Sequence, residues 1–257
     1  NSMSNTPDFS ALLDNKAGNY RVLPGGAAFC SGVMPHAGYE VVRVLLDRWI
    51  PLDQGYAFIE QHLKSIGRPV QAFCGIELRV PAPLALSDWS TFNVPYLAQL
   101  RKWGLIFDNL SAVCRSNIAL ATYPPNATAL CAFSYTVPST ANVKTFFLSG
   151  QADVDGGGKI ISDGDVGPAA MAARARFVID TVATTLARLG ASWQDTTQVA
   201  LFHVHDIPDL WGPTLLGAFG NALRRGVLTY RARPPIAGME VELEARAVRQ
   251  ELVIETA

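Results

Sequence analysis

A strand that runs into a Ser-Gly turn is predicted at Val143-Lys-Thr-Phe-Phe-Leu148-Ser149-Gly150-Gln151. After a glycine-rich turn, Gly167-Pro168 begins a helix, because proline at the first helical position loses no backbone hydrogen bond. Apolar residues then recur at helical spacing up to Gly190, a residue type that commonly ends helices. The elements expected beyond it are a strand at 197–204, a second helix begun by Asp209 and a strand at 238–248. The order is therefore strands, helix, strand, helix, strand.

The first half of the chain repeats this order. Its Ser31-Gly32 turn precedes Ser149-Gly150 by 118 residues, and its helix-ending Gly67 precedes Gly190 by 123. The elements expected here are strands at 41–50 and 70–80, a helix begun by Asp53, a helix begun by Asp88 or Ser90, and strands near 111–119 and 129–137. We therefore predict an α+β fold of two tandem units, 1–138 and 139–257, each a mixed sheet with two helices on one face. The uncovered sheet faces must be buried as well, by packing between the units and between chains.

The composition is that of a globular protein that handles a small molecule. Of 257 residues, 49% are hydrophobic and only 17% are charged, which excludes a disordered chain and a coiled coil. A formal net charge of −1 argues against a nucleic acid partner, which requires a basic surface. No apolar stretch approaches the roughly 20 residues that cross a bilayer. Asn1–Asn15 lacks the pattern of a secretory signal, so we expect a cytoplasmic protein without a membrane partner. The low charge content also indicates a homo-oligomer.

Both halves carry motifs of one known family. The motifs are Phe147-Leu-Ser-Gly-Gln151, Leu186-Ala-Arg-Leu-Gly-Ala-Ser192, Val199-Ala-Leu-Phe202 and Met239-Glu-Val-Glu-Leu-Glu-Ala245 in the second half, and Phe92-Asn93-Val-Pro-Tyr96 and Cys114-Arg115-Ser116 in the first. In order and spacing they resemble the RidA (YjgF) family of enamine/imine deaminases, and the two-unit build resembles the 2-aminomuconate deaminases. The resemblance implies units with a chorismate-mutase-like fold and a trimer of two-unit chains. It also implies sites in clefts between neighbouring subunits, where an arginine holds the substrate carboxylate.

The same resemblance assigns complementary parts of the site to the two halves. The first half supplies Asn93, Tyr96 and Arg115, and the second supplies Ser149, Gly150 and the last-strand glutamate, Glu242. The second half departs from the family at its own clamp position, where it has Arg225-Gly226-Val227, and it has Pro213 or a neighbour where asparagine is expected. The last strand of the first half, Ala129-Leu-Cys-Ala-Phe-Ser-Tyr135, has no glutamate. We therefore expect one working cleft per pair of halves, formed either within a chain or between chains.

The residue types suit hydrolysis of an enamine or imine next to a carboxylate. The fork of Arg115 can pair both carboxylate oxygens, with a structural salt bridge as the alternative. Glu242 can position water or move protons, or it can belong with Glu240 and Glu244 to a solvated acidic face. Asn93 can bond the carboxylate or the leaving nitrogen, or it can cap a helix.

Several further residues have two interpretations each. Backbone N–H groups of Ser149 and Gly150 can meet a carboxylate, or the two residues can form a plain turn. Arg225 can receive a second carboxylate, or it can pair with acids across an interface. We interpret Cys114 as an inert buried thiol. We interpret His203 and His205 as ordinary strand histidines, because no third metal ligand lies at diagnostic spacing. No metal site is therefore predicted. No nucleotide-binding motif is present, so no cofactor is predicted either.

The sequence thus predicts a hydrolase that converts an enamine or imine carboxylic acid to the keto acid and ammonia. The candidate substrates are 2-aminomuconate-type intermediates of aromatic degradation. Two alternatives stay open. One is a chorismate-converting enzyme of the chorismatase type, which also pairs two such units. The other is a non-catalytic protein that binds a small molecule.

Overall fold

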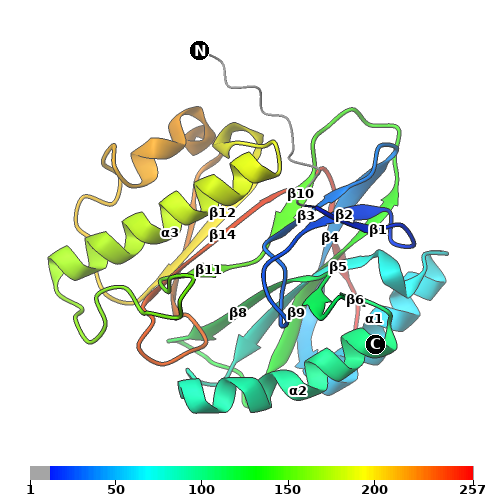
Figure 1. Ribbon diagram of the computed structural model, residues 1–257, viewed down its shortest axis with the longest axis horizontal. Helices are drawn as coiled ribbons and strands as arrows, with labels where there is room; N and C mark the ends of the chain where they lie inside the picture. Colours follow the sequence, from blue (N-terminus) through cyan, green and yellow to red (C-terminus); the bar gives the residue numbers. More distant parts are fainter. Residues whose placement is uncertain (1–11, 257) are drawn as a thin grey trace.

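The computed structural model describes residues 12–256 (Figure 1). Residues 1–11 lie outside this range, and they include most of the N-terminal stretch for which no secretory signal is expected. The α-helices are α1 (Leu52–Ser65), α2 (Leu86–Lys102) and α3 (Pro168–Arg188), and the 3-10 segments are η1 (Val70–Ala72), η2 (Trp193–Asp195) and η3 (Leu216–Arg225). Within residues 12–256, no helix is long and apolar enough to cross a membrane.

Most strands form a single mixed sheet. Its strands are β1 (Leu13–Asn15), β2 (Tyr20–Leu23), β3 (Gly32–Pro35), β10 (Phe146–Leu148), β14 (Val241–Ala247), β12 (Gln198–His203), β13 (Leu228–Arg233), β8 (Cys114–Leu120), β5 (Phe73–Val80), β9 (Ala129–Pro138), β4 (Tyr39–Pro51) and β15 (Glu251–Ile254), in that spatial order, while β11 (Gln151–Ala152) pairs with β14 off this path. A separate hairpin joins β6 (Ile106–Phe107) to β7 (Leu110–Ser111). Two groups of strands, β10-β14-β12-β13 and β8-β5-β9-β4, correspond to the two halves of the chain. The fold is therefore α+β with two units in tandem, as predicted.

The helices cover the outer faces of these two groups of strands. In Figure 1, α3 lies over β14 and β12, whereas α1 and α2 lie over the strands of the first unit. The α3 helix begins at Pro168 after Gly167 and ends before Gly190, whose φ is 70°. Its apolar stripe packs on the residues of β14 that alternate toward it, including Val241 and Leu243. The predicted helix boundaries and periodicity are confirmed for this element.

The inner faces of the two units pack on each other. Glu77 of β5 accepts hydrogen bonds from Arg43 of β4 at 2.7 and 2.8 Å and from Arg246 of β14 at 3.3 Å. Burial alone would raise the pKa of Glu77, but Arg246 and Arg43 hold it well below its ordinary value. Phe147 packs directly on Gly75, where an added Cβ would lie 3.0 Å from the ring. The uncovered faces are therefore buried between the units of one chain.

The chain ends and the two Ser-Gly turns link the units further. β3 of the first half pairs with β10 of the second, and the C-terminal β15 returns to pair in parallel with β4. The backbone N–H of Ser149 donates to the carbonyl of Ser31 at 3.2 Å, so the two turns that revealed the repeat lie against each other. This contact places one end of the second unit beside β8 of the first.

The structure differs from the predicted elements at several places. The second helix of the second half is instead the 3-10 segment η3, which is broken at Gly220 (φ 56°, ψ −130°). Glycines spaced through this region disfavour a continuous α-helix, and Asp209 has a φ of 50° and does not cap a helix. The α2 helix begins at Leu86, before both predicted caps, and Asp53 lies inside the first turn of α1. Strands β1, β2, β13 and β15 were not predicted.

Candidate functional site

A cavity of about 350 Å³ lies between the two units, within one chain. The first unit contributes Phe29, Leu86, Trp89, Arg115 and Asn117 to its walls, and the second contributes residues of the 150–160 segment together with Pro235, Ile236, Met239 and Glu242. Two backbone hydrogen bonds close one side, from the N–H of Leu84 to the carbonyl of Pro235 (2.7 Å) and from the N–H of Ala237 to the carbonyl of Leu84 (2.8 Å). We call this cavity the inter-unit cleft. Residues of both halves of one chain line this cleft, so a cleft within the chain is present in this structure.

Arg115 extends from β8 into the inter-unit cleft. Its Nη1 donates to Asn93 Oδ1 at 2.8 Å, and its guanidinium carbon lies 5.0 Å from the Trp89 ring centre and 4.9 Å from that of Tyr96. Its buried Nη2 has no hydrogen-bond partner in the described part of the chain, and Arg115 forms no ion pair there. Burial lowers the pKa of Arg115 to about 10, so the guanidinium stays charged at neutral pH. The alternative interpretation of Arg115 as a structural salt bridge is therefore not supported in the described chain, where rings and one amide surround this cation.

Asn93 and Tyr96 reach the guanidinium from α2. Both are buried, and Asn93 lies inside the helix rather than at its start, so it does not cap the helix. Its side-chain oxygen accepts a hydrogen bond from Nη1 of Arg115, so the other terminal nitrogen of the guanidinium remains available to a ligand. The Tyr96 hydroxyl is buried without a hydrogen-bond partner among residues 12–256, and burial raises the pKa of this phenol well above its usual value.

Glu242 faces Arg115 from the second unit. It lies on β14 and is 4% exposed, and Glu244 is 2% exposed, so these carboxyls do not form a solvated acidic face. Burial, reinforced by the neighbouring Glu244, raises the pKa of Glu242 well above its ordinary range. Its Oε2 has no hydrogen-bond partner in the described chain. Burial therefore favours the protonated form of this carboxyl beside the cleft.

The Ser149-Gly150 turn positions the two groups relative to each other. The Arg115 N–H donates to Ser149 Oγ at 2.9 Å, and the Gly150 N–H donates to the Arg115 carbonyl at 3.2 Å. The N–H groups of Ser149 and Gly150 are thus both used within the protein, which contradicts the idea that they meet a substrate carboxylate. A Cβ on Gly150 would lie 2.9 Å from Glu242 Oε2, so glycine is needed here for the close approach of this carboxyl.

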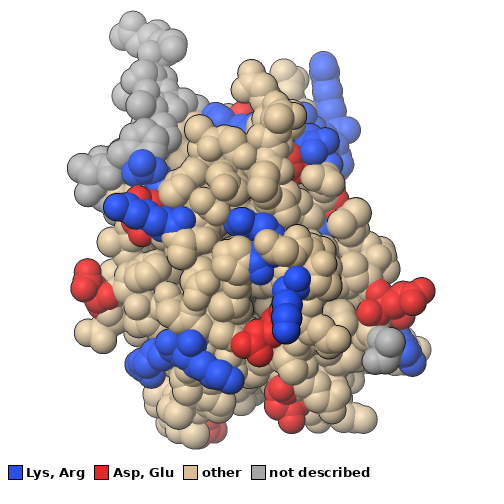
Figure 2. Space-filling model, turned by 90° about the vertical axis from the view of Figure 1, so that its right-hand side faces the viewer, with Lys and Arg blue, Asp and Glu red and all other residues tan. Residues whose placement is uncertain are grey.

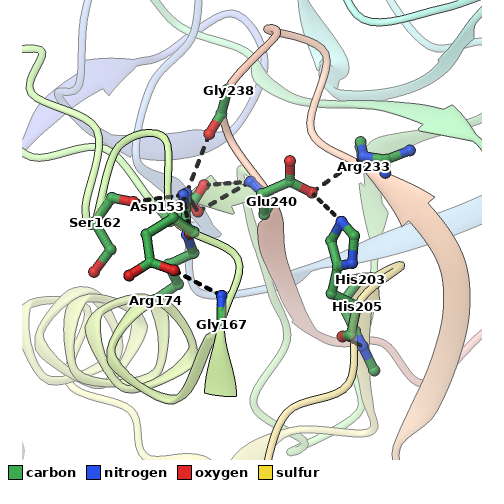
Figure 3. Close-up of polar contacts among 10 residues, drawn as sticks. Asp153, Ser162, Gly167, Arg174, His203, His205, Arg233, Gly238 and Glu240 are labelled. Atoms are coloured by element: carbon green, nitrogen blue, oxygen red, sulfur yellow. Dashed lines mark hydrogen bonds and ion pairs between the residues drawn. The ribbon is translucent and has the colours of Figure 1, made fainter. Parts of the chain in front are cut away.

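A buried ion pair between Arg174 and Asp153 stabilises part of the cleft wall (Figure 3). Arg174 of α3 donates to Asp153 at 2.7 Å and to the carbonyl of Gly238 at 3.1 Å. The Asp153 carboxylate also accepts the backbone N–H of Glu240 at 3.0 and 3.1 Å. These bonds tie the segment after β11 to the start of β14, and both segments line the cleft.

The remaining candidates lie outside the inter-unit cleft. Arg225 is not brought to it, since its Nη1 donates to the carbonyls of Gln194 (3.0 Å) and Thr196 (2.6 Å). His205 lies 3.8 Å from Glu240 (Figure 3), and His203 bonds the carbonyl of His205 at 2.9 Å. Residues 12–256 contain no cluster of three or more His, Cys, Asp or Glu side chains that could hold a metal ion. Cys114 is buried, with its sulfur 3.4 Å from that of Cys30.

Several residues that line the cleft are not predicted from the sequence. Phe29 and Trp89 lie against the Arg115 guanidinium, and Asn117 lines the cleft two residues further along β8. The sequence does not mark the two aromatic residues as site residues, because an isolated aromatic side chain usually indicates a position in the hydrophobic core. Asn117 could have been found from the alternation of a strand, which places it on the same face as Arg115.

A buried cation and a buried carboxyl that line one cleft suit an enzyme that acts on a small carboxylate. The sequence matches agree, and the chain belongs to the 2-aminomuconate deaminase CnbZ family, whose profile matches residues 12–252. A 2-amino-5-chloromuconate deaminase of Comamonas testosteroni is 33% identical over 92% of this chain and 96% of its own length.

Solved structures give weaker similarities. A chorismatase is 14% identical, with a TM-score of 0.44 over 85% of this chain and 77% of its own. A Rid family protein of unknown function from Yersinia pestis is 16% identical, with a TM-score of 0.32 over 44% of this chain and 83% of its own. Both TM-scores lie below 0.5, and membership of the family rests on the sequence matches.

Proposed function

We propose that this protein hydrolyses a 2-aminomuconate-type enamine, an intermediate of aromatic degradation, to the keto acid and ammonia, and that the inter-unit cleft is its active site. The observation that carries the proposal is the buried guanidinium of Arg115: its Nη2 has no partner in the described chain, and Arg115 lines the cleft together with Glu242. A substrate carboxylate would supply the missing counter-charge. The presence of Glu242 in the cleft favours a catalytic protein over one that only binds its ligand.

Binding would orient the substrate before any bond changes. Arg115 pairs the carboxylate next to the amine-bearing carbon, while Asn93 fixes the plane of the guanidinium through Nη1. The rings of Phe29, Trp89 and Tyr96 keep water away from this ion pair and so strengthen it. The carbon and nitrogen that react then lie on the side of the cleft that Glu242 occupies.

Proton transfer would follow at Glu242. The enamine first becomes an imine as a proton moves from nitrogen to carbon. The Glu242 carboxyl then donates its proton to the imine nitrogen while a water oxygen bonds to the imine carbon, and the carboxylate takes a proton from that water. In the second step the carboxyl protonates the amine nitrogen and the C–N bond breaks. Ammonia leaves as the hydroxyl proton returns to Glu242 and the C=O bond forms.

Ammonia release tests this function directly. We expect the protein to accelerate ammonia release from 2-aminomuconate generated in situ by an upstream enzyme, above the spontaneous rate. The comparison substrate is 2-aminoacrylate, generated in the same way. Preference for 2-aminoacrylate would make the protein a general imine-clearing enzyme, and no acceleration with either substrate would overturn the proposed activity.

We further propose that the protein is cytoplasmic and forms a homo-oligomer, with a trimer of two-unit chains as the expected form. β15 is an edge strand of the described sheet, and its Leu252 and Val253 are 45% and 71% exposed. On the face shown in Figure 2, the Lys and Arg side chains are separated by wide uncharged areas. Exposed apolar edge strands are commonly covered by a second chain. Light scattering should give a mass of several chains, and a stable monomer at micromolar concentration would contradict the oligomer.

A further inference from the structure

Buried polar atoms without a partner gather at the inter-unit cleft. Within residues 12–256 they include Arg115 Nη2, Glu242 Oε2 and both amide atoms of Asn117, and all three residues line the cleft. Asn117 is only 4% exposed. Native proteins rarely leave a buried amide without hydrogen bonds, because each lost bond costs stability. Arg115 and Glu242 have parts in the proposed chemistry, whereas Asn117 has none.

Asn117 lies at the centre of the seam between the units. It follows Arg115 by two residues on β8, so both side chains lie on the same face with their Cα atoms about 7 Å apart. The second unit contacts β8 on both sides of this position, through Gly150 at Arg115 and through Arg233 at Ala119. Asn117 thus faces the stretch of the cleft that extends away from the clamp.

The cleft contains little else that could hold a second anionic group. Arg115 is the only cation among the described residues that line it. The side-chain nitrogen of Gln151 already donates to the carbonyl of Ala152 at 2.7 Å. Asp155 is turned into its own loop, where its Oδ1 accepts the N–H groups of Gly157 and Lys159, both at 2.9 Å. The free amide donor on the cleft wall is therefore Asn117 Nδ2.

We propose that Asn117 Nδ2 donates a hydrogen bond to the distal carboxylate of a dicarboxylic substrate whose other carboxylate is held by Arg115, and that this bond selects dicarboxylates over monocarboxylates. The inference rests on the proposed function, because it assumes that the inter-unit cleft binds the substrate. An amide suits this position, since it adds a donor without a second fixed charge, and the carboxylate can be released again after turnover.

Two unreactive ligands isolate this contact from the chemistry. Trans,trans-muconate and sorbate share a six-carbon diene, both lack nitrogen, and only muconate has a carboxylate at both ends. We expect the wild type to bind muconate about 10- to 100-fold more tightly than sorbate by calorimetry, which is the range of a hydrogen bond to a charged group. Asn117→Leu should remove this preference by weakening muconate alone. Asn117→Asp, of nearly equal size, should weaken muconate further through repulsion between carboxylates.

Ser116→Ala is the matched control. Ser116 is the next residue of β8, and its hydroxyl is also buried without a partner in the described chain, but it points to the opposite face and does not line the cleft. This variant should keep the preference for muconate. Equal weakening of muconate and sorbate in Asn117→Leu, or an unchanged preference, would overturn the assignment of Asn117. Binding of muconate without any ammonia release in the turnover assay would instead overturn the proposed function and leave this contact standing.

Discussion

Arg115→Ala is expected to lower kcat/KM for the 2-aminomuconate-type substrate by about 10³-fold, corresponding to about 4 kcal/mol of lost stabilisation. The guanidinium is the cation of the inter-unit cleft in the described chain, and it is buried among the rings of Phe29, Trp89 and Tyr96. In this dry setting an ion pair with a carboxylate is screened little by water. Without the clamp the carboxylate would enter an apolar cleft with no counter-charge.

Arg115→Lys separates the charge from the shape of the fork. An ammonium retains the charge but presents no planar pair of donors, and it cannot bond Asn93 and a carboxylate in the same plane. We expect a loss of about 10²-fold for this variant, and millimolar guanidinium should restore part of the activity of Arg115→Ala.

Arg225→Ala removes an arginine that bonds backbone carbonyls outside the cleft, and it should keep kcat/KM within about threefold. An active Arg115→Ala protein, or an Arg225→Ala protein with an equal loss, would contradict the clamp.

The elements that could be predicted from the sequence are those with strong local signals. Pro168 and Gly190 mark the ends of α3, and the alternation in β14 separates the residues that pack on α3 from Glu242 and Glu244. β13 and β15 gave no such signal, because their side chains are largely exposed and their pairing with β8 and β4 is set by distant parts of the chain. The apolar residues of the 3-10 segment η3 have the spacing of an α-helix, which predicts a helix there, but the segment is broken at Gly220.

The candidate site shows the same division between local and distant information. The resemblance groups Asn93, Arg115, Gly150 and Glu242. In the structure Arg115, Gly150 and Glu242 line one cleft, and Asn93 accepts a hydrogen bond from Arg115. The sequence left open whether Glu242 lies in a cleft or on a solvated acidic face. The structure shows that it is buried, because exposure depends on how the two units pack and not on the alternation of glutamates along one strand. The local group of arginines suggests Arg225 as a site for a second carboxylate, but in the structure its Nη1 donates to two backbone carbonyls instead.

Glu242→Gln is expected to lower kcat by about 10²- to 10⁴-fold, the usual contribution of a general acid or base. Glutamine keeps the size of the side chain and can donate a hydrogen bond, but it cannot give a proton to the imine nitrogen. Burial and the neighbouring Glu244 keep the wild-type carboxyl protonated well above the usual pH range of a glutamate. The rate of the wild type should therefore fall as the pH rises through this raised pKa, and the variant should lack that descending limb. The matched control is Glu240→Gln, two residues earlier, just before β14 and outside the cleft lining, which should retain the limb and most of the rate.

Stability distinguishes a chemical role of Glu242 from a structural one. Between the ordinary pKa of glutamate, about 4.3, and the raised value in the fold, the native state binds more protons than the unfolded state. The free energy of unfolding therefore falls as the pH rises through this window, because the buried carboxyl must eventually ionise. Glutamine never ionises, so Glu242→Gln should be at least as stable as the wild type at alkaline pH in a thermal melt. A variant that is stable but inactive would assign the loss to the missing proton, whereas one that unfolds early, or keeps the descending limb, would show that Glu242 does not perform the proton transfer.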